Sequence, residues 1–63
     1  MANRVLRLPA VQHICALSRS NIYLKISHNE FPRPIRLGTH AVGWLESDIE
    51  EWITRRIEES RQA

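Results

Sequence analysis

The run Ser18-Arg19-Ser20-Asn21 places four side chains with hydrogen-bonding groups at consecutive positions. Ser18 is explained by helix capping, because a serine hydroxyl before a helix can accept the free backbone N–H of the third helical residue, here Asn21. The next three residues match the edges of DNA bases, since arginine pairs with guanine, asparagine with adenine, and serine with several bases. The run would also suit a capped helix start with soluble side chains, but its composition favours contact with DNA.

Further polar residues follow at positions that suit contacts with phosphates. Tyr23 and Lys25 belong to the same predicted helix, where they could reach the DNA backbone and position the protein without reading sequence. Arg33 and Arg36 precede the loop Thr39-His40, and cations beside such a loop are attracted to the backbone or to the minor groove. We expect a phosphate contact from Arg36, whereas the histidine of the loop suits an ordinary exposed loop equally well.

Catalytic and metal-binding chemistry find little support in the sequence. Cys15 lies among the apolar residues of a predicted helix, which is typical of a buried structural thiol. His13, His28 and His40 are scattered, and no H-x₃-H or C-x₂-C pair has the spacing of zinc ligands. The two glycines stand apart and do not form a phosphate-binding loop. We therefore expect no enzymatic activity, no catalytic residue, no metal ion and no cofactor.

The length of 63 residues suits one small domain, which we expect to be a DNA-binding domain over residues 1–63 with an ordered core at about 6–58. The hydrophobic fraction of 43% and the charged fraction of 25% are ordinary globular values. No apolar run approaches the roughly 20 residues of a membrane span, and the N-terminal residues lack the apolar core of a signal peptide. The single cysteine excludes an intrachain disulfide and fits a reducing cytoplasm.

Charge is divided unevenly along the chain. Residues 1–45 carry six basic side chains and one carboxylate, a net charge of +5, whereas residues 46–63 carry three basic side chains and six carboxylates, a net charge of −3. A basic body followed by an acidic segment suggests a polyanion as partner on one side of the molecule. The alternative is a set of solvated faces with chance asymmetry.

A first helix is predicted from Pro9 to about Cys15, because proline is favoured at the first helical position. Val11, Ile14 and Cys15 would form its apolar stripe, since they recur at the spacing of one helix face.

A second helix is predicted directly after a tight turn, over Arg19–Ser27. Ser18 is its expected cap, and Ile22 and Ile26 form its expected buried stripe. Leu24 falls on the opposite, mostly polar face and has no evident packing partner there.

Two short strands are predicted next, at residues 35–37 and 42–44, joined by a four-residue loop in a β-hairpin. Alternation would turn Ile35 and Leu37 inward and Arg36 outward.

The last helix has a capping-box signal, with Ser47 before it and Glu50 three residues later. Its expected buried face consists of Ile49, Trp52, Ile53 and Ile57, and we expect the helix to fray from Glu58 onward. Both tryptophans, Trp44 and Trp52, are expected in the core rather than on a stacking surface.

The predicted order is helix, tight turn, helix, β-hairpin and helix. This order is typical of a mostly α protein with a small β-hairpin, a winged helix-turn-helix whose hairpin is the wing and whose C-terminal helix closes the core. The candidate DNA-contacting residues are then Ser18, Arg19, Ser20, Asn21, Tyr23, Lys25, Arg33, Arg36, Thr39 and His40.

Three stretches also carry a specific resemblance: LSRSNIY at 17–23, FPRPIRLG at 31–38, and VGW at 42–44 followed by SDIEEW at 47–52. Together they resemble the AlpA family of prophage regulatory proteins, and the match extends from Arg7 to Ile57. The family is similar in fold to MerR-type winged helices and to phage excisionases. The resemblance implies a reading helix at Arg19 to Lys25 and a wing at Arg36 to His40.

What the resemblance implies about function is sequence-specific binding of double-stranded DNA by a transcriptional regulator of a prophage or genomic island. An excisionase, or recombination directionality factor, that bends DNA for an integrase is the alternative. A more distant alternative is a protein-interaction module that acts through the acidic last helix. Integrase or RNA polymerase would be the protein partner, a dimer or tandem assembly on DNA is conceivable, no membrane is involved, and the location would be the bacterial cytoplasm, at the nucleoid.

Overall fold

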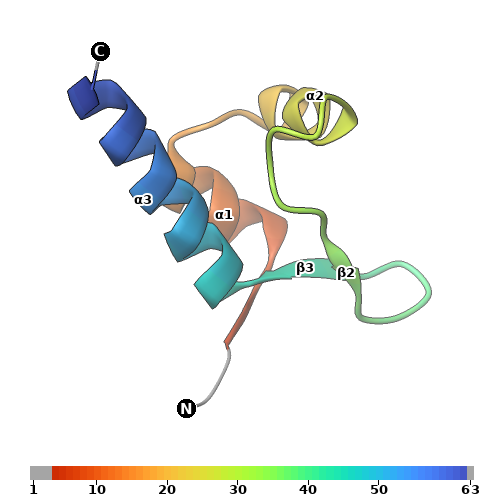
Figure 1. The fold of residues 1–63 in the computed structure, drawn as a ribbon. Helices are drawn as coiled ribbons and strands as arrows, with labels where there is room; N and C mark the ends of the chain where they lie inside the picture. The colour runs from red at the N-terminus through yellow and green to blue at the C-terminus, as the bar shows by residue number, and fades with distance from the viewer. Residues whose placement is uncertain (1–3, 63) are drawn as a thin grey trace.

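Three helices and a small antiparallel sheet make up residues 4–62, which are the part of the chain described by the computed structural model (Figure 1). The elements follow in the order β1 (Val5–Leu6), α1 (Leu8–Cys15), α2 (Arg19–Ser27), β2 (Ile35–Arg36), β3 (Val42–Leu45) and α3 (Glu46–Gln62). The fold is a winged helix-turn-helix, as the sequence predicts. We call β2, β3 and the loop between them the wing.

The turn between α1 and α2 is tight because Ala16 adopts a left-handed conformation, with φ of 57°. The N–H of Leu17 returns to the carbonyl oxygen of Gln12 at 3.2 Å, which ends α1. The bounds of α2 are those predicted. The predicted start of α1 was one residue late, because Leu8 is the first helical residue and Pro9 the second. Proline is tolerated at either position, since neither N–H has a partner inside the helix.

The sheet has a strand that the sequence patterns do not reveal. β1 pairs antiparallel with β3, and β2 pairs with the other edge of β3, so the strand order is β1-β3-β2. Val5 lies opposite Leu45, and Leu6 lies opposite Trp44. A strand of two residues is too short to show alternation, and its partner is almost forty residues away in the sequence.

The register of the hairpin reverses the predicted facing of its first strand. Ile35 lies opposite Gly43, and Arg36 lies opposite Val42. Directly opposite residues share a face of the sheet, and successive residues alternate. Arg36 therefore lies on the same face as Trp44, which is fully buried under the helices, while Ile35 lies on the outer face. Ile35 and Leu37 are 40% and 45% exposed, so the prediction that they face inward was wrong.

The core lies between the three helices and one face of the sheet. Its fully buried side chains are Val11, Ile22, Trp44 and Ile49, with Leu6 and Phe31 almost as enclosed. These come from every helix, from β1 and β3, and from the segment between α2 and β2, so each element except β2 contributes to one core. The predicted apolar stripe of α1 is only partly buried, because Ile14 is 46% exposed.

The start of α3 differs from the predicted capping box. β3 runs directly into α3, so Ser47 is the second helical residue rather than the residue before the helix. The first N–H of the helix, on Glu46, donates to the carbonyl oxygen of Arg4 at 2.8 Å, in the segment that leads into β1. At its other end α3 stays helical to Gln62, past the predicted fraying point, and Ile57 is 45% exposed instead of buried.

Candidate nucleic-acid interface

α2 and the loop of the wing lie on the side of the molecule away from the C-terminal half of α3 (Figure 1). These two elements carry nine of the ten candidate residues or adjoin them, and Arg33 is the exception. Nine of the ten candidates are exposed and Lys25 is half-buried. The arrangement leaves the basic part of the chain free to meet a partner while α3, with most of the carboxylates, lies at the other side.

The orientation of α2 is fixed by Ile22, which is fully buried against the core. Successive residues of a helix are about 100° apart around its axis, so residues two positions before and after Ile22 point away from the core. These are Ser20 and Leu24, with Asn21 at the flank, and all three are exposed. The N-terminal turn of α2 thus presents polar side chains outward, as a reading helix requires.

Ser18 acts as the predicted cap of α2. Its backbone is extended, and its Oγ accepts the N–H of Asn21 at 3.2 Å. The capping bond satisfies one of the free N–H groups of the first turn and holds the helix start in place. Ser18 thus has a structural role as the cap of α2.

Arg19 is held along the surface of α2 by Tyr23. The guanidinium carbon of Arg19 lies 5.8 Å from the centre of the Tyr23 ring, within the range of a cation–π contact. The two residues are one helical turn apart, so this contact is local to α2. Both side chains are exposed, so the phenol is part of the same surface as the guanidinium.

The basic residues of this side are free of carboxylates. Within residues 4–62 no carboxylate lies within ion-pair distance of Arg19, Lys25 or Arg36. Three other arginines, by contrast, are paired: Arg4 with Glu46, Arg55 with Glu51, and Arg56 with Glu59. A polyanion would therefore meet the α2 side without displacing internal ion pairs.

Arg36, Thr39 and His40 belong to the wing rather than to α2. The loop is closed by the N–H groups of Leu37 and Gly38, which both donate to the carbonyl oxygen of Ala41, at 2.8 and 3.2 Å. Thr39 and His40 are exposed at its tip. Arg36 lies opposite Val42, on the helix-bearing face of the sheet, and its side chain is exposed.

Arg33 is not brought to the wing. Its Nη2 donates to the Oδ1 of Asn29 at 3.0 Å, and it lines a groove between the segment after α2 and α3. Asp48 and Glu51 of α3 line the same groove. The sequence order suggested that Arg33 would lie near Arg36 and the wing loop. In the structure Arg33 lies at the groove beside α3 instead.

A family model described as prophage CP4-57 regulatory protein (AlpA) matches residues 4–57. The chain belongs to this AlpA family. A protein of Enterobacteria phage P4 named uncharacterized protein ORF88 is 48% identical over 54 residues, which are 86% of this chain and 61% of that protein. The DNA-binding transcriptional activator AlpA of Escherichia coli strain K12 is 38% identical over 61 residues, which cover 87% of each chain. The AlpA-family chain thus spans less than two thirds of the phage P4 relative and most of the Escherichia coli one.

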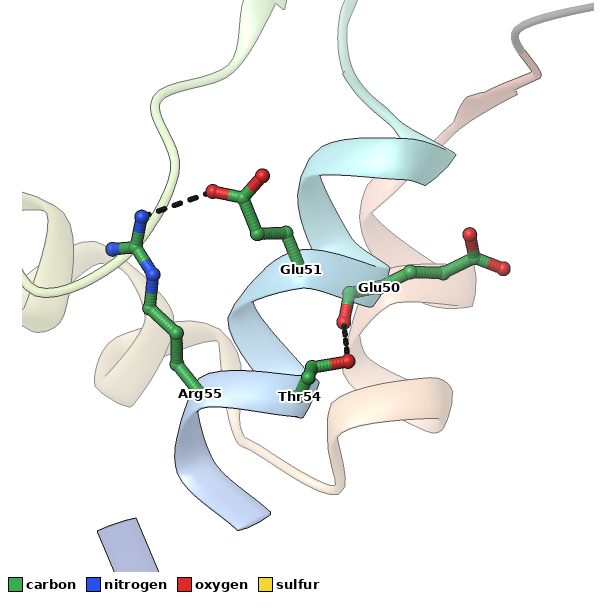
Figure 2. A network of polar contacts seen from close by, with 4 residues as sticks. All are labelled: Glu50, Glu51, Thr54 and Arg55. Atoms are coloured by element: carbon green, nitrogen blue, oxygen red, sulfur yellow. Dashed lines mark hydrogen bonds and ion pairs between the residues drawn. The ribbon is translucent and has the colours of Figure 1, made fainter. Parts of the chain in front are cut away.

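The acidic face of α3 is partly neutralised within the AlpA-family chain itself. Arg55 donates from Nη2 to the Oε1 of Glu51 at 3.0 Å, and Thr54 donates to the backbone carbonyl oxygen of Glu50 at 2.9 Å (Figure 2). The carboxylate of Glu50 points away from Arg55 (Figure 2). Arg56 pairs with Glu59 one turn further on. These local pairs account for part of the charge pattern of α3 without an external partner.

Cys15 is half-buried, and burial raises the pKa of its thiol above the ordinary value. The thiol is therefore protonated at neutral pH and is a poor nucleophile. In residues 4–62 no three histidine, cysteine or acidic side chains come together in a metal-binding group. None of the helices in that range is long and apolar enough to cross a bilayer.

The structure adds one residue to the surface that sequence reasoning leaves unassigned. Among residues 4–62, Leu24 is the most exposed of the large apolar side chains, at 54%, and it lies in the middle of the outward face of α2. The sequence signal for Leu24 is a leucine at a position where the helix periodicity predicts a polar, outward face. A buried Ile22 two residues earlier indicates that Leu24 cannot share the same core.

Proposed function

We propose that this AlpA-family protein is a sequence-specific DNA-binding transcriptional regulator of a prophage or genomic island. The observation that carries the proposal is the exposure of Arg19, Ser20 and Asn21 in the first turn of α2, where within residues 4–62 Arg19, Lys25 and Arg36 have no carboxylate within ion-pair distance. The Escherichia coli relative, named a DNA-binding transcriptional activator, supports it. Regulation by binding needs no catalytic group, and we propose no enzymatic activity.

In this proposal the N-terminal turn of α2 enters the major groove. Arg19 makes a bidentate pair with guanine, and Asn21 makes one with adenine. Ser20 hydrogen-bonds to a base edge without selecting one base. Tyr23 and Lys25 contact phosphates and fix the register of the helix on the duplex. Ser18 contributes mainly through its cap, since its oxygen already accepts the N–H of Asn21.

The wing contacts the DNA backbone beside the major-groove site. Arg36 supplies the charge, and Thr39 and His40 lie at the loop tip where they reach phosphates or the minor groove. Arg33 is the weakest candidate of the set, because it lines a groove with Asp48 and Glu51 of α3 and one of its N–H groups already donates to Asn29.

One module of this size buries about 600–1,000 Å² of its surface on DNA, which limits its discrimination between sites. We therefore propose paired or tandem sites, occupied by two or more copies. Integrase or RNA polymerase is the class of protein that a regulator bound at such sites would meet, and the exposed carboxylate of Glu50 on α3 is available to it.

The direct test is recovery of a preferred duplex from a pool of random sequences, followed by fluorescence anisotropy with the recovered and a scrambled duplex across a salt series. We expect selective binding with a log–log salt slope of roughly −3 to −5, since each phosphate contact contributes about −0.9. Failure to enrich any sequence, together with no binding at low salt, would overturn the proposal and direct attention to a protein partner.

Bending separates the regulator from the excisionase alternative. An excisionase works by deforming DNA for an integrase, and a bend changes gel mobility according to the position of the site in the fragment. A regulator does not need to bend DNA, so little positional dependence would count against the excisionase. Strong positional dependence would favour the excisionase.

A further inference from the structure

Leu24 has no structural role that explains its position. It lies at 54% exposure on α2, outside the buried core and outside the partly buried apolar residues that pack against that core. The buried contacts of α2 are made by Ile22, with Ile26 alongside it. A single exposed leucine is common on a protein surface, but this one lies on the face of α2 that carries the candidate base-contacting residues, where it is available to the same partner.

The neighbourhood of Leu24 leaves its side chain as the projecting group of that turn. The hydroxyl of Ser27 donates to the carbonyl oxygen of Leu24 at 2.6 Å, so this hydroxyl is engaged with the backbone. Ser20, one turn earlier on the same face, belongs to the turn that we place against base edges. Leu24 thus continues the line of exposed side chains that Ser20 begins on this face of α2.

The major groove offers one apolar feature to such a side chain, the C5-methyl group of thymine. We infer that Leu24 reads a thymine methyl by van der Waals contact, one helical turn beyond the bases contacted by Ser20 and Asn21. The inference rests on the proposed binding of DNA by α2. It adds a role for Leu24, to which the proposed function assigns no contact.

The size of the effect follows from the burial of one methyl group. Removing such a group from an apolar contact weakens binding by roughly three- to fivefold. Replacement of thymine by deoxyuridine removes only this methyl and leaves every hydrogen-bonding group in place. The contact is thus testable by a change of one carbon on the DNA and a matching truncation on the protein.

The experiment uses the full chain and the duplex that it selects from a random pool. Each thymine is replaced in turn by deoxyuridine, and affinities are measured by anisotropy for the unaltered protein and for Leu24→Ala. Alanine is the best helix former, so α2 is expected to stay intact, which circular dichroism checks. Ile14→Ala is the control, because Ile14 is also an exposed apolar residue, at 46%, but belongs to α1.

We expect deoxyuridine at one or two positions to weaken binding of the unaltered protein and of Ile14→Ala by roughly three- to fivefold. Leu24→Ala should bind the thymine and deoxyuridine duplexes equally. If Leu24→Ala keeps the same preference for thymine at every position, or if the unaltered protein has no such preference, the inference is overturned while DNA binding stands. If no duplex is selected at all, both the inference and the proposed function fail.

Discussion

The indole N–H of Trp44 donates to the carbonyl oxygen of Pro32 at 2.9 Å and ties the central strand of the sheet to the segment that leaves α2. Phe31 packs edge-on against the rings of both Trp44 and Trp52. Trp52 in turn donates to the carbonyl oxygen of Glu30 at 2.8 Å. The connection between α2 and the wing is thus anchored at three successive residues, which fixes these two elements relative to each other.

Trp44→Phe should lower the free energy of unfolding by about 2 kcal/mol, because it opens a space in the core and leaves the carbonyl oxygen of Pro32 unpaired. Trp52→Phe should cost less, since Trp52 is only half-buried and water can reach its hydrogen bond. Urea unfolding followed by circular dichroism measures both. An equal loss of unfolding free energy in the two variants would contradict the argument that burial strengthens the contribution of the Trp44–Pro32 hydrogen bond.

Gly43 is expected to tolerate no side chain at the centre of the sheet. A Cβ there would lie 2.6 Å from Cγ1 of Val5 and 3.0 Å from both Cδ1 of Leu37 and the carbonyl oxygen of Leu6. Gly43→Ala should therefore cost about 1–3 kcal/mol through overpacking. Gly38→Ala is the matched control, because nothing lies within 4 Å of its Cβ position. A comparable loss of stability in both variants would contradict the packing argument.

Ser18 allows capping and DNA contact to be separated. Ser18→Ala should cost about 1 kcal/mol of stability because the N–H of Asn21 loses its acceptor. Ser18→Asp should keep the stability, since aspartate caps as well as serine does, but its negative charge should weaken DNA binding. Thermal unfolding and anisotropy distinguish the two effects. A Ser18→Asp protein with unchanged DNA affinity would place the start of α2 away from the phosphates.

Alanine substitutions of Arg19 and Arg36 should affect DNA binding in different ways. Arg19→Ala should cost about 1–3 kcal/mol of binding and relax sequence preference, because it loses a base contact. Arg36→Ala should weaken binding to all duplexes equally and reduce the salt slope by about 1. Arg61→Ala removes the same charge from the last turn of α3 and serves as the control. If all three variants behave alike, only net charge matters and the assignment of roles is wrong.

The sequence predicts the helix-turn-helix closely because its signals are local. Ser18 caps α2 through a bond to a residue three positions away, and the spacing of Ile22 and Ile26 identifies the buried face within one helix. The candidate residues of α2 follow directly from that face. Their exposure was therefore predictable from the pattern of one segment.

The sheet and the start of α3 depend on contacts between distant residues and were predicted less well. The facing of Arg36 follows from its register with Val42, which the alternation of one strand does not fix. β1 exists only because Val5 and Leu6 meet β3, and beside this pairing the carbonyl oxygen of Arg4 accepts the first N–H of α3. The separation of Arg33 from the wing likewise reflects its bond to Asn29.

The central claim is that α2 and the wing, and not α3, meet DNA. Titration of a selected duplex into ¹⁵N-labelled protein, followed by amide chemical shifts in two-dimensional NMR, tests it residue by residue. We predict the largest shifts at Arg19 to Lys25 and at the wing loop around Thr39 and His40, with small shifts from Arg55 to Arg61. Shifts confined to α3, with α2 unchanged, would contradict the claim and assign the interface to the acidic helix.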